Sequence, residues 1–358
     1  MPASSSSVRS LHTFAEIVSQ PETWLTSQRE IASDSAFQKA LKDAASRREC
    51  LFVGCGTSFY LAEAAAASWT LLTGKRTRAL PASEILLFPA LSQLDAADLQ
   101  VIVISRSGKT SEAVRAADLL TNKYKLPTLG ITCARDSELS RACQSTIAIP
   151  SADEKSMVMT RSFSSMLLAL VGLAASQSKT GSFTESVAGI SNALSGKIES
   201  FNTQVEEFVA KHTFVDYIYL AQGPFFAIAR EAALKITEMS CSYAQPYHTL
   251  EFRHGPKSIV EPKTCLTFFL SETSMKDEVE VLTEMKELGG TIVAVCKRAS
   301  AEVRASSDLV FEIDADVPEP VLLAPFIVPA QLLGFHTGVK KGFNPDEPKN
   351  LSRVVILD

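Results

Sequence analysis

Short, fully apolar runs that alternate with amphipathic stretches set the pattern of this chain. The clearest run, residues 101–104 reading VIVI, is β-branched throughout, which suits a strand buried on both faces of a parallel sheet. Most runs are followed by apolar residues spaced three or four apart, which predicts a helix. The runs expected to form strands are residues 50–53, 79–83, 101–105, 128–132, 146–149, 217–220, 265–270, 291–295 and 309–313. This alternation predicts an α/β fold with doubly wound parallel sheets and helices on both faces.

The order of these elements occurs twice. Ser105 and Ser271 end matching strands, and Thr128 and Thr291 begin the next matching pair. Each half runs strand, glycine loop, helix, strand, Ser/Thr loop, helix, strand, turn and strand. The pattern therefore predicts a duplicated α/β domain.

The loop from Ser105 to Thr110 carries three hydroxyls, a guanidinium and an ammonium between a strand and a helix. Such a loop presents unpaired N–H groups and the positive end of the helix dipole, so it can hold an anion, and its composition favours phosphate. Gly108-Lys109-Thr110 also matches the end of a nucleotide-binding GxxxxGK[ST] loop, but Val103 stands where the first glycine is required. A capped helix without a ligand is the other interpretation.

A second loop of this kind, Gly54 to Ser58, follows the strand at residues 50–53. Its glycines allow close backbone approach, and Thr57 adds a further hydroxyl. Ligands of parallel sheets bind outside the carboxyl ends of the strands, so both loops should lie at the same edge, which favours a ligand site over helix capping. In the second half, the corresponding loop at residues 271–274 has no glycine and carries Glu272. This carboxylate disfavours phosphate, so we expect the first half to bind it.

Two groups in the second half could carry acid/base chemistry. Glu231, Lys235 and Glu238 lie at i, i+4 and i+7 and share one helix face. They form either a solvated, salt-bridged stripe or a site where the lysine orients a substrate and a glutamate acts as general base. His248 and His254 belong to an HxxExxH stretch whose spacing does not fit a metal-binding helix. His254 lies in a charged loop before a rigid Gly-Pro turn, where acid/base chemistry is plausible.

Composition narrows the setting. A chain of 358 residues holds one large domain or two smaller ones, and its net charge of −5 gives no general attraction to nucleic acid or anionic membranes. The seven cysteines are scattered without a CxxC pair, as in free thiols of a reducing cytoplasm. Residues 1–10 do not read as a signal peptide, and residues 167–175 are too short to span a membrane. We expect a cytoplasmic protein with no nucleic-acid or membrane partner and no apolar stretch of membrane-spanning length.

Taken in order, the motifs resemble the sugar-isomerase (SIS) domain family. They are GCGTS at residues 54–58, SxSGxT at 105–110, ExALKxxE at 231–238, ExxHGP at 251–256 and QLLGFH with a later PKNL within 331–351. The resemblance covers nearly the whole chain and is strongest to the isomerase half of glutamine–fructose-6-phosphate aminotransferases. The stretches MTRSF and EFRHGPKS look more like stand-alone amino-sugar-phosphate deaminases and tagatose-6-phosphate ketose/aldose isomerases.

This resemblance implies two tandem SIS domains, each a five-stranded parallel sheet of the flavodoxin-like type flanked by helices. It also implies a homodimer with a phosphosugar in an active site at the subunit interface, and no metal or organic cofactor. The expected parts are an N-terminal helical arm at 1–34, a phosphosugar-binding domain at 35–180, a helical linker at 181–205, a second domain at 206–345 and a C-terminal tail at 346–358 that closes the active site.

The resemblance also implies individual roles. Glu238 would move a proton between C1 and C2, Lys235 would be its neighbouring site lysine, and His254 would open the sugar ring from the other subunit. The residues implied to bind the phosphate and the sugar are Thr57, Ser58, Ser105, Arg106, Ser107, Thr110, Thr160 and Arg353. Two are departures: Arg106 stands where the synthases have glutamine, and Arg353 stands where they have a lysine that forms a Schiff base. Arginine stays protonated and cannot form that imine.

The expected activity follows from these roles. The chain carries no glutaminase domain, so we do not expect it to take ammonia from glutamine. We expect a phosphosugar aldose–ketose isomerase that acts on an amino-sugar 6-phosphate, as a deaminase of glucosamine- or galactosamine-6-phosphate. A fructosamine-6-phosphate deglycase and a non-catalytic phosphosugar sensor are the alternatives.

Overall fold

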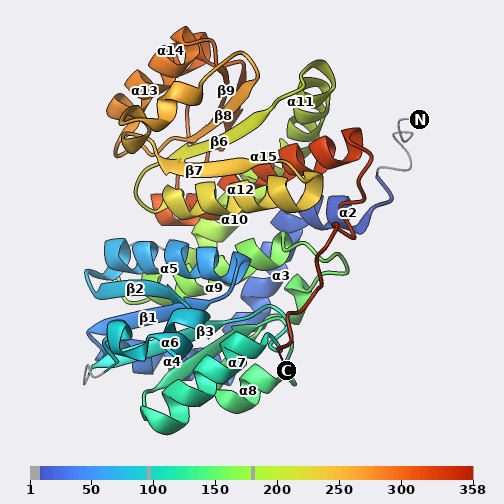
Figure 1. Ribbon diagram of the computed structural model, residues 1–358. Coiled ribbons are helices and arrows are strands. Elements are labelled where there is room, and N and C mark those ends of the chain that lie inside the picture. Colours follow the sequence, from blue (N-terminus) through green and yellow to red (C-terminus); the bar gives the residue numbers. More distant parts are fainter. Residues whose placement is uncertain (1–8, 95–97, 179–181, 358) are drawn as a thin grey trace. The chain divides into compact units, whose positions relative to one another are not determined.

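The computed structural model describes residues 9–94, 98–178 and 182–357, apart from the side chains of residues 44 and 45. The chain divides into two compact units, each with its own parallel sheet (Figure 1). Unit 1 comprises residues 1–21, 155–160 and 189–351, and unit 2 comprises residues 22–154, 161–188 and 352–358. The arm expected at 1–34 is described only from residue 9 onward.

Unit 2 holds a sheet in the order β2-β1-β3-β4-β5, all strands parallel. The strands are β1 (Glu49–Gly54), β2 (Arg76–Pro81), β3 (Leu99–Ile104), β4 (Thr128–Thr132) and β5 (Ser145–Ala148). This is the flavodoxin-like order of a doubly wound sheet. All six residues of β3 are buried, as its β-branched run predicts. The strand expected at 79–83 begins earlier, at Arg76. It ends at Pro81, because Ala82 already belongs to the next helix.

Helices cover both faces of this sheet (Figure 1). One face carries α5 (Thr57–Thr73) and α9 (Arg161–Ala175), and the other carries α6 (Ala82–Leu87), α7 (Ser111–Asp118) and α8 (Glu138–Ala142). The remaining helical segments are α3 (Gln20–Ala32), which enters unit 2 at residue 22, α4 (Ser35–Ser46), η1 (Pro89–Ser92), the π turn η2 (Leu119–Lys123) and η3 (Pro150–Ala152). Valines and leucines of β1 and β3 pack on the buried alanines of α7, which builds the core under this face.

Unit 1 repeats the arrangement with a sheet in the order β10-β9-β8-β6-β7. The strands are β6 (Asp216–Ala221), β7 (Ala244–His248), β8 (Thr264–Phe269), β9 (Thr291–Cys296) and β10 (Leu309–Glu312). Counted within the unit this is the strand order of unit 2, so the duplicated α/β fold is confirmed. β7 was not predicted: its sequence AQPYH is polar, contains Pro246 and pairs with β6 alone. An edge strand tolerates proline and is not required to be apolar.

Helices again lie on both faces (Figure 1). One face carries α13 (Met275–Glu287) and α14 (Ala301–Ser306). The other carries α12 (Phe225–Ser240) and α15 (Glu319–Lys340), and α15 also contacts α2 (His12–Val18) and α11 (Ile198–Lys211). The remaining segments are α10 (Phe183–Ser195), which enters unit 1 at residue 189, η4 (Glu251–Arg253) and η5 (Pro256–Ile259).

Helix α15 corrects the expectation that no apolar stretch reaches membrane-spanning length. Within the described residues it alone is long and apolar enough to cross a membrane, yet its most apolar window is entirely buried in the protein. A helix that is apolar all round is the core of a domain when other elements enclose it, as α2, α11 and α12 do here. Its glycines let α12 come close, since a Cβ on Gly338 would lie 2.2 Å from the carbonyl oxygen of Met239.

Candidate active site

The two loops with glycines and hydroxyls leave the sheet of unit 2 at neighbouring positions. β1 and β3 are adjacent parallel strands with Val53 opposite Val103, so residues 54–58 and 105–110 follow the carboxyl ends of paired strands. The expectation that both loops lie at one edge is confirmed. The strand order reverses at this pair, which is where doubly wound sheets bind their ligands.

The first loop brings the backbone close to the start of α5. A Cβ on Gly54 would lie 2.3 Å from the carbonyl oxygen of Ser58, so this position accepts only glycine. Gly56 precedes the helix with a φ of 54°, in the region that favours glycine. Thr57 and Ser58 then form the first turn and are both buried. Their hydroxyls are thus held at the positive end of a 17-residue helix.

The second loop keeps its hydroxyls within one turn. Ser105 donates to the hydroxyl of Thr110 at 3.3 Å, and Ser107 accepts the N–H of Lys109 at 3.1 Å. Gly108 has a φ of 63°, and a Cβ there would lie 2.3 Å from Oγ of Ser137. Within the described ranges, no carboxylate accepts a hydrogen bond from the hydroxyls of this loop. These hydroxyls and the N-terminus of α7 suit a phosphate group.

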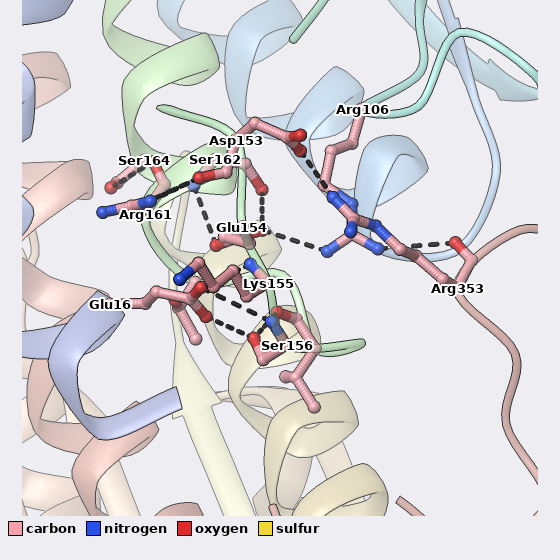
Figure 2. A network of polar contacts seen from close by, with 12 residues as sticks. Glu16, Arg106, Asp153, Glu154, Lys155, Ser156, Arg161, Ser162, Ser164 and Arg353 are labelled. Atoms are coloured by element: carbon pink, nitrogen blue, oxygen red, sulfur yellow. Dashed lines mark hydrogen bonds and ion pairs between the residues drawn. The ribbon is translucent and has the colours of Figure 1, made fainter. Parts of the chain in front are cut away.

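Arg106 is engaged differently from its neighbours. Its Nη1 lies 3.0 Å from Oε2 of Glu154 in an ion pair whose side chains are 5% and 0% exposed (Figure 2). Glu154 also accepts the N–H of Ser162 at 3.1 Å and the hydroxyl of the same residue. Because the buried carboxylate balances the guanidinium, Arg106 ties this loop to the segment after β5 instead of offering an uncompensated charge. Sequence reasoning missed Glu154, which lies 48 positions away and follows no periodic pattern.

The C-terminal tail lies along the start of α7. Nη2 of Arg353 is 2.9 Å from Oδ1 of Asp153 in a half-exposed ion pair, shown in Figure 2. The N–H of Ser111 donates to the carbonyl oxygen of Val355 at 3.2 Å, and the N–H of Leu357 donates to Oγ of Ser111 at 2.9 Å. The tail therefore takes up a donor in the first turn of the helix that follows the hydroxyl loop.

In unit 1, α12 carries a buried group of three charges. Nζ of Lys235 lies 3.3 Å from Oε1 of Glu231 and also donates to Oε2 of Glu238. The side chains of Lys235 and Glu231 are 0% exposed and that of Glu238 is 18% exposed, so the interpretation as a solvated stripe is wrong. Burial by itself lowers the pKa of Lys235, but the two carboxylates outweigh it and raise the pKa above its ordinary value. Of the three, only Glu238 is accessible to a small molecule.

Close packing on α15 fixes the turn that holds these charges. A Cβ on Gly334 would lie 3.2 Å from the carbonyl oxygen of Lys235 and 2.7 Å from Cε of Met239. The absence of a side chain at this position therefore lets the two helices approach, and Lys235 is held by backbone contact as well as by its ion pairs.

His254 is exposed on a turn between η4 and η5, and the next residue, Gly255, has a φ of 131°. The turn is tied to α13 by Glu284, which lies 2.7 Å from Nε of Arg253 and 2.7 Å from Nζ of Lys257. Within the described part of the chain, no hydrogen bond joins the imidazole to Glu238. The imidazole therefore lies exposed on the surface of unit 1.

Thr160 belongs to the short segment of unit 1 at residues 155–160. It is buried, and its carbonyl oxygen accepts from Nε2 of Gln331 at 3.4 Å. Glu16, also buried, accepts the N–H of Lys155 at 2.6 Å and the hydroxyl of Ser156, as Figure 2 shows. Glu16 therefore anchors this segment, a role that the structure shows and that no local sequence pattern indicates.

The fold and these residues define a duplicated doubly wound α/β protein, with a hydroxyl loop at the switch point of one half and a buried ion triad in the other. The model of the SIS domain family matches residues 45–176 and 194–336. The chain belongs to the SIS domain family.

Two curated relatives are glutamine–fructose-6-phosphate aminotransferases (isomerizing). The one from Caldanaerobacter subterraneus subsp. tengcongensis is 29% identical over 269 residues, which are 72% of this chain and 44% of the relative. The one from Francisella tularensis is 26% identical over 366 residues, which are 96% of this chain and 58% of the relative. The chain thus spans about half the length of the curated relatives it matches.

Solved structures match over almost the whole chain. Glucosamine-6-phosphate deaminase from Thermotoga maritima has a TM-score of 0.75 at 27% identity and covers 97% of this chain and 100% of its own. Tagatose-6-phosphate ketose/aldose isomerase from Escherichia coli has a TM-score of 0.84 at 22% identity and covers 100% of this chain and 98% of its own. The second match shows the fold alone.

Proposed function

We propose that this protein is a phosphosugar aldose–ketose isomerase of the SIS family that acts on an amino-sugar 6-phosphate and releases ammonia. The observation that carries the proposal is the buried triad on α12, in which Glu238 alone reaches solvent. A buried ammonium costs several kcal/mol unless it is paired, and this one holds a carboxylate at an accessible position. Structural stability alone does not require that placement, whereas a general base does.

A bound phosphosugar would use the residues of the resemblance in the following roles. Its phosphate would take the hydroxyls of Ser105, Ser107 and Thr110, with Thr57 and Ser58 toward the sugar. His254 from a second copy of the chain would help to open the ring. Glu238 would take the proton from C2 of the open aldose and return it to C1, which leaves an imine at C2. Water would then hydrolyse this imine to ammonia and a ketose 6-phosphate.

Lys235 and the two departures fit this direction of reaction. The Lys235 ammonium, kept charged by its two carboxylates, would steady Glu238 during the proton transfer. Deamination begins from an aldose that already carries its nitrogen, so no lysine imine with a ketose is needed and Arg353 is compatible with it. Arg106 would position the loop through Glu154 instead of binding the phosphate alone.

Several observations support this proposal over a fructosamine-6-phosphate deglycase or a sensor. The Thermotoga maritima deaminase matches 97% of this chain at 27% identity. A sensor needs the hydroxyl loop but has no use for a carboxylate that a buried lysine holds at an accessible position. All seven cysteines are free thiols, which agrees with the reducing cytoplasm that we propose as its location.

The test measures ammonia release and phosphosugar binding on the same preparations. Glu238→Gln should lower turnover of glucosamine- or galactosamine-6-phosphate about a thousandfold with binding retained, because only the base is lost. Ser107→Ala should weaken binding about tenfold with little change in turnover at saturation. The exposed Glu206→Gln in α11 is the matched control and should behave as wild type.

The products separate the alternatives. A free amino acid with glucose 6-phosphate would assign a deglycase, and binding without turnover in the wild type would assign a sensor. Turnover that survives Glu238→Gln would disprove the proposed base.

A further inference from the structure

The loop of unit 1 that corresponds to the hydroxyl loop of unit 2 is already filled by a carboxylate of the chain itself. It comprises residues 270–274, between β8 and α13, and is one residue shorter than the loop at 105–110. Glu319, in the first turn of α15, accepts the hydroxyl of Ser271 at 2.8 Å, the N–H of Glu272 at 2.5 Å and the hydroxyl of Thr273 at 3.0 Å. Two hydroxyls and one backbone N–H thus converge on both oxygens of one carboxylate.

A second carboxylate, on α13, accepts further hydrogen bonds from the loop. Glu278, which is 0% exposed, accepts the N–H of Ser271 at 3.3 Å, the hydroxyl of Ser274 at 2.6 Å and the hydroxyl of Thr249 at 2.7 Å. Donors on both sides of the loop therefore have internal acceptors. The loop of unit 2 is different, because no carboxylate of the described residues takes the hydroxyls of Ser105, Ser107 or Thr110.

The local charges agree with an internal anion. Nζ of Lys297 lies 3.1 Å from Oε2 of Glu272, and the Arg298 guanidinium also acts on this carboxylate. Glu319 and Glu272 add two negative charges at this loop, and Glu278 a third underneath. A phosphate dianion arriving from outside would meet these charges and would find its donors occupied.

We propose that Glu319 is the built-in occupant of a second anion cradle, and that it limits the chain to a single phosphate site, in unit 2. The duplicated fold supplies two loops of the same origin at the same switch point, and the donors of the second remain in place. Glu319 satisfies them with a group of nearly the same chemistry as the lost ligand: two oxygens that share one negative charge. This inference concerns unit 1 and does not depend on which reaction the enzyme catalyses.

The test is chemical rescue of Glu319→Ala, followed by thermal unfolding. Removing three hydrogen bonds should lower the melting temperature by about 5–10 °C. Formate, and more weakly phosphate, should restore part of this loss in a saturable way relative to chloride at the same ionic strength, because each can occupy the vacated cradle. Glu319→Gln, which fills the space without a charge, should be destabilised and not rescued. Asp277→Ala removes an exposed carboxylate from the first turn of α13 and should show neither effect.

The outcomes decide the proposal separately from the activity. A loss of melting temperature in Glu319→Ala that neither formate nor phosphate restores would overturn the proposal. If Glu319→Ala does not fold, calorimetry of the wild type still decides, because two phosphosugars bound per chain would also overturn it. A wild type that binds no phosphosugar, while Glu319→Ala is rescued by formate, would leave Glu319 as the occupant of the cradle in unit 1 and would remove both the phosphate site of unit 2 and the proposed function.

Discussion

At the scale of single residues, burial keeps one histidine of this protein neutral. His336 in α15 is 6% exposed, and its Nε2–H donates to Oδ1 of Asn202 at 2.7 Å. Burial lowers the pKa of this imidazole from 6.5 to about 4. The folded state therefore keeps His336 neutral over a range in which the unfolded chain takes up a proton.

This shift predicts a pH dependence of stability. The contribution of His336 is fully present above pH 6.5 and is lost as the pH falls toward 4, because only the unfolded state gains the proton. Between pH 7 and pH 5 the loss should be about 2 kcal/mol. Urea unfolding across this range should show that loss in the wild type and in the exposed control His12→Gln, but not in His336→Gln. An unchanged slope in His336→Gln would contradict the assignment.

At the scale of elements, the crossing of α12 and α15 sets the position of the ion triad. A Cβ on Gly338 would lie 2.2 Å from the carbonyl oxygen of Met239. Because this oxygen belongs to the backbone, no side-chain rotation can relieve the clash. Gly338→Ala should cost about 1–3 kcal/mol of folding free energy and lower turnover, since it pushes the turn with Glu238 away. Gly189→Ala in α10 is the control, because its Cβ would meet Val317 at an ordinary 3.5 Å. A fully active and stable Gly338→Ala variant would contradict this prediction, because it would show that α12 and α15 can move apart at this point without cost.

The turn with His254 gives a second prediction at this scale. Glu284 holds Arg253 and Lys257, which flank the histidine, in half-exposed ion pairs. Glu284→Gln should slow ring opening about tenfold by loosening the turn, with under about 1 kcal/mol lost in stability. A 4,5-dideoxy substrate analogue, which has no hydroxyl that can close a five- or six-membered ring, should be turned over by the variant at the wild-type rate. The exposed Glu280→Gln on the same helix should have no effect, and an equal defect on both substrates would contradict a role in ring opening.

The sequence predicted most elements of the fold, but it predicted the contacts of the site less completely. β3 and α12 were predicted because a β-branched run and residues spaced three or four apart are local signals of a strand and of a helix. β7 was missed because an edge strand pairs on one side and needs no apolar pattern. Glu154 was missed because an ion partner can come from any point of the chain that folding brings near. The burial of Lys235 could not be read from spacing, since a solvated stripe and a buried triad have the same period.

At the scale of the whole molecule, we expect two copies of the chain to share each active site. His254 is exposed and is not bonded to Glu238 of its own chain, which agrees with action on a second copy. Glu238→Gln and His254→Ala should each be inactive as homodimers. Mixed dimers formed by subunit exchange should contain one intact site each, so a 1:1 mixture should regain about a quarter of the wild-type activity.

The control for this complementation mixes Glu238→Gln with Glu238→Ala, which leaves no intact site in any dimer. Activity in the control, or none in the Glu238→Gln and His254→Ala mixture, would contradict a shared site. Sedimentation of the wild type measures the dimer independently of its activity.

The N-terminal residues of unit 1 have a consequence for biosynthesis. α2 packs through Phe14 on Phe335 of α15, and Thr13 binds Asp346. The first residues of unit 1 to leave the ribosome therefore pack against residues that are translated more than 300 positions later. The sheet of unit 2 is complete by residue 148, so most of unit 2 can fold while translation continues and only its tail at 352–358 is added later. Unit 1 cannot close its core until α15 has emerged. A nascent chain therefore carries an incomplete unit 1 for most of its synthesis, and that unit is where chaperones and proteases would compete with folding.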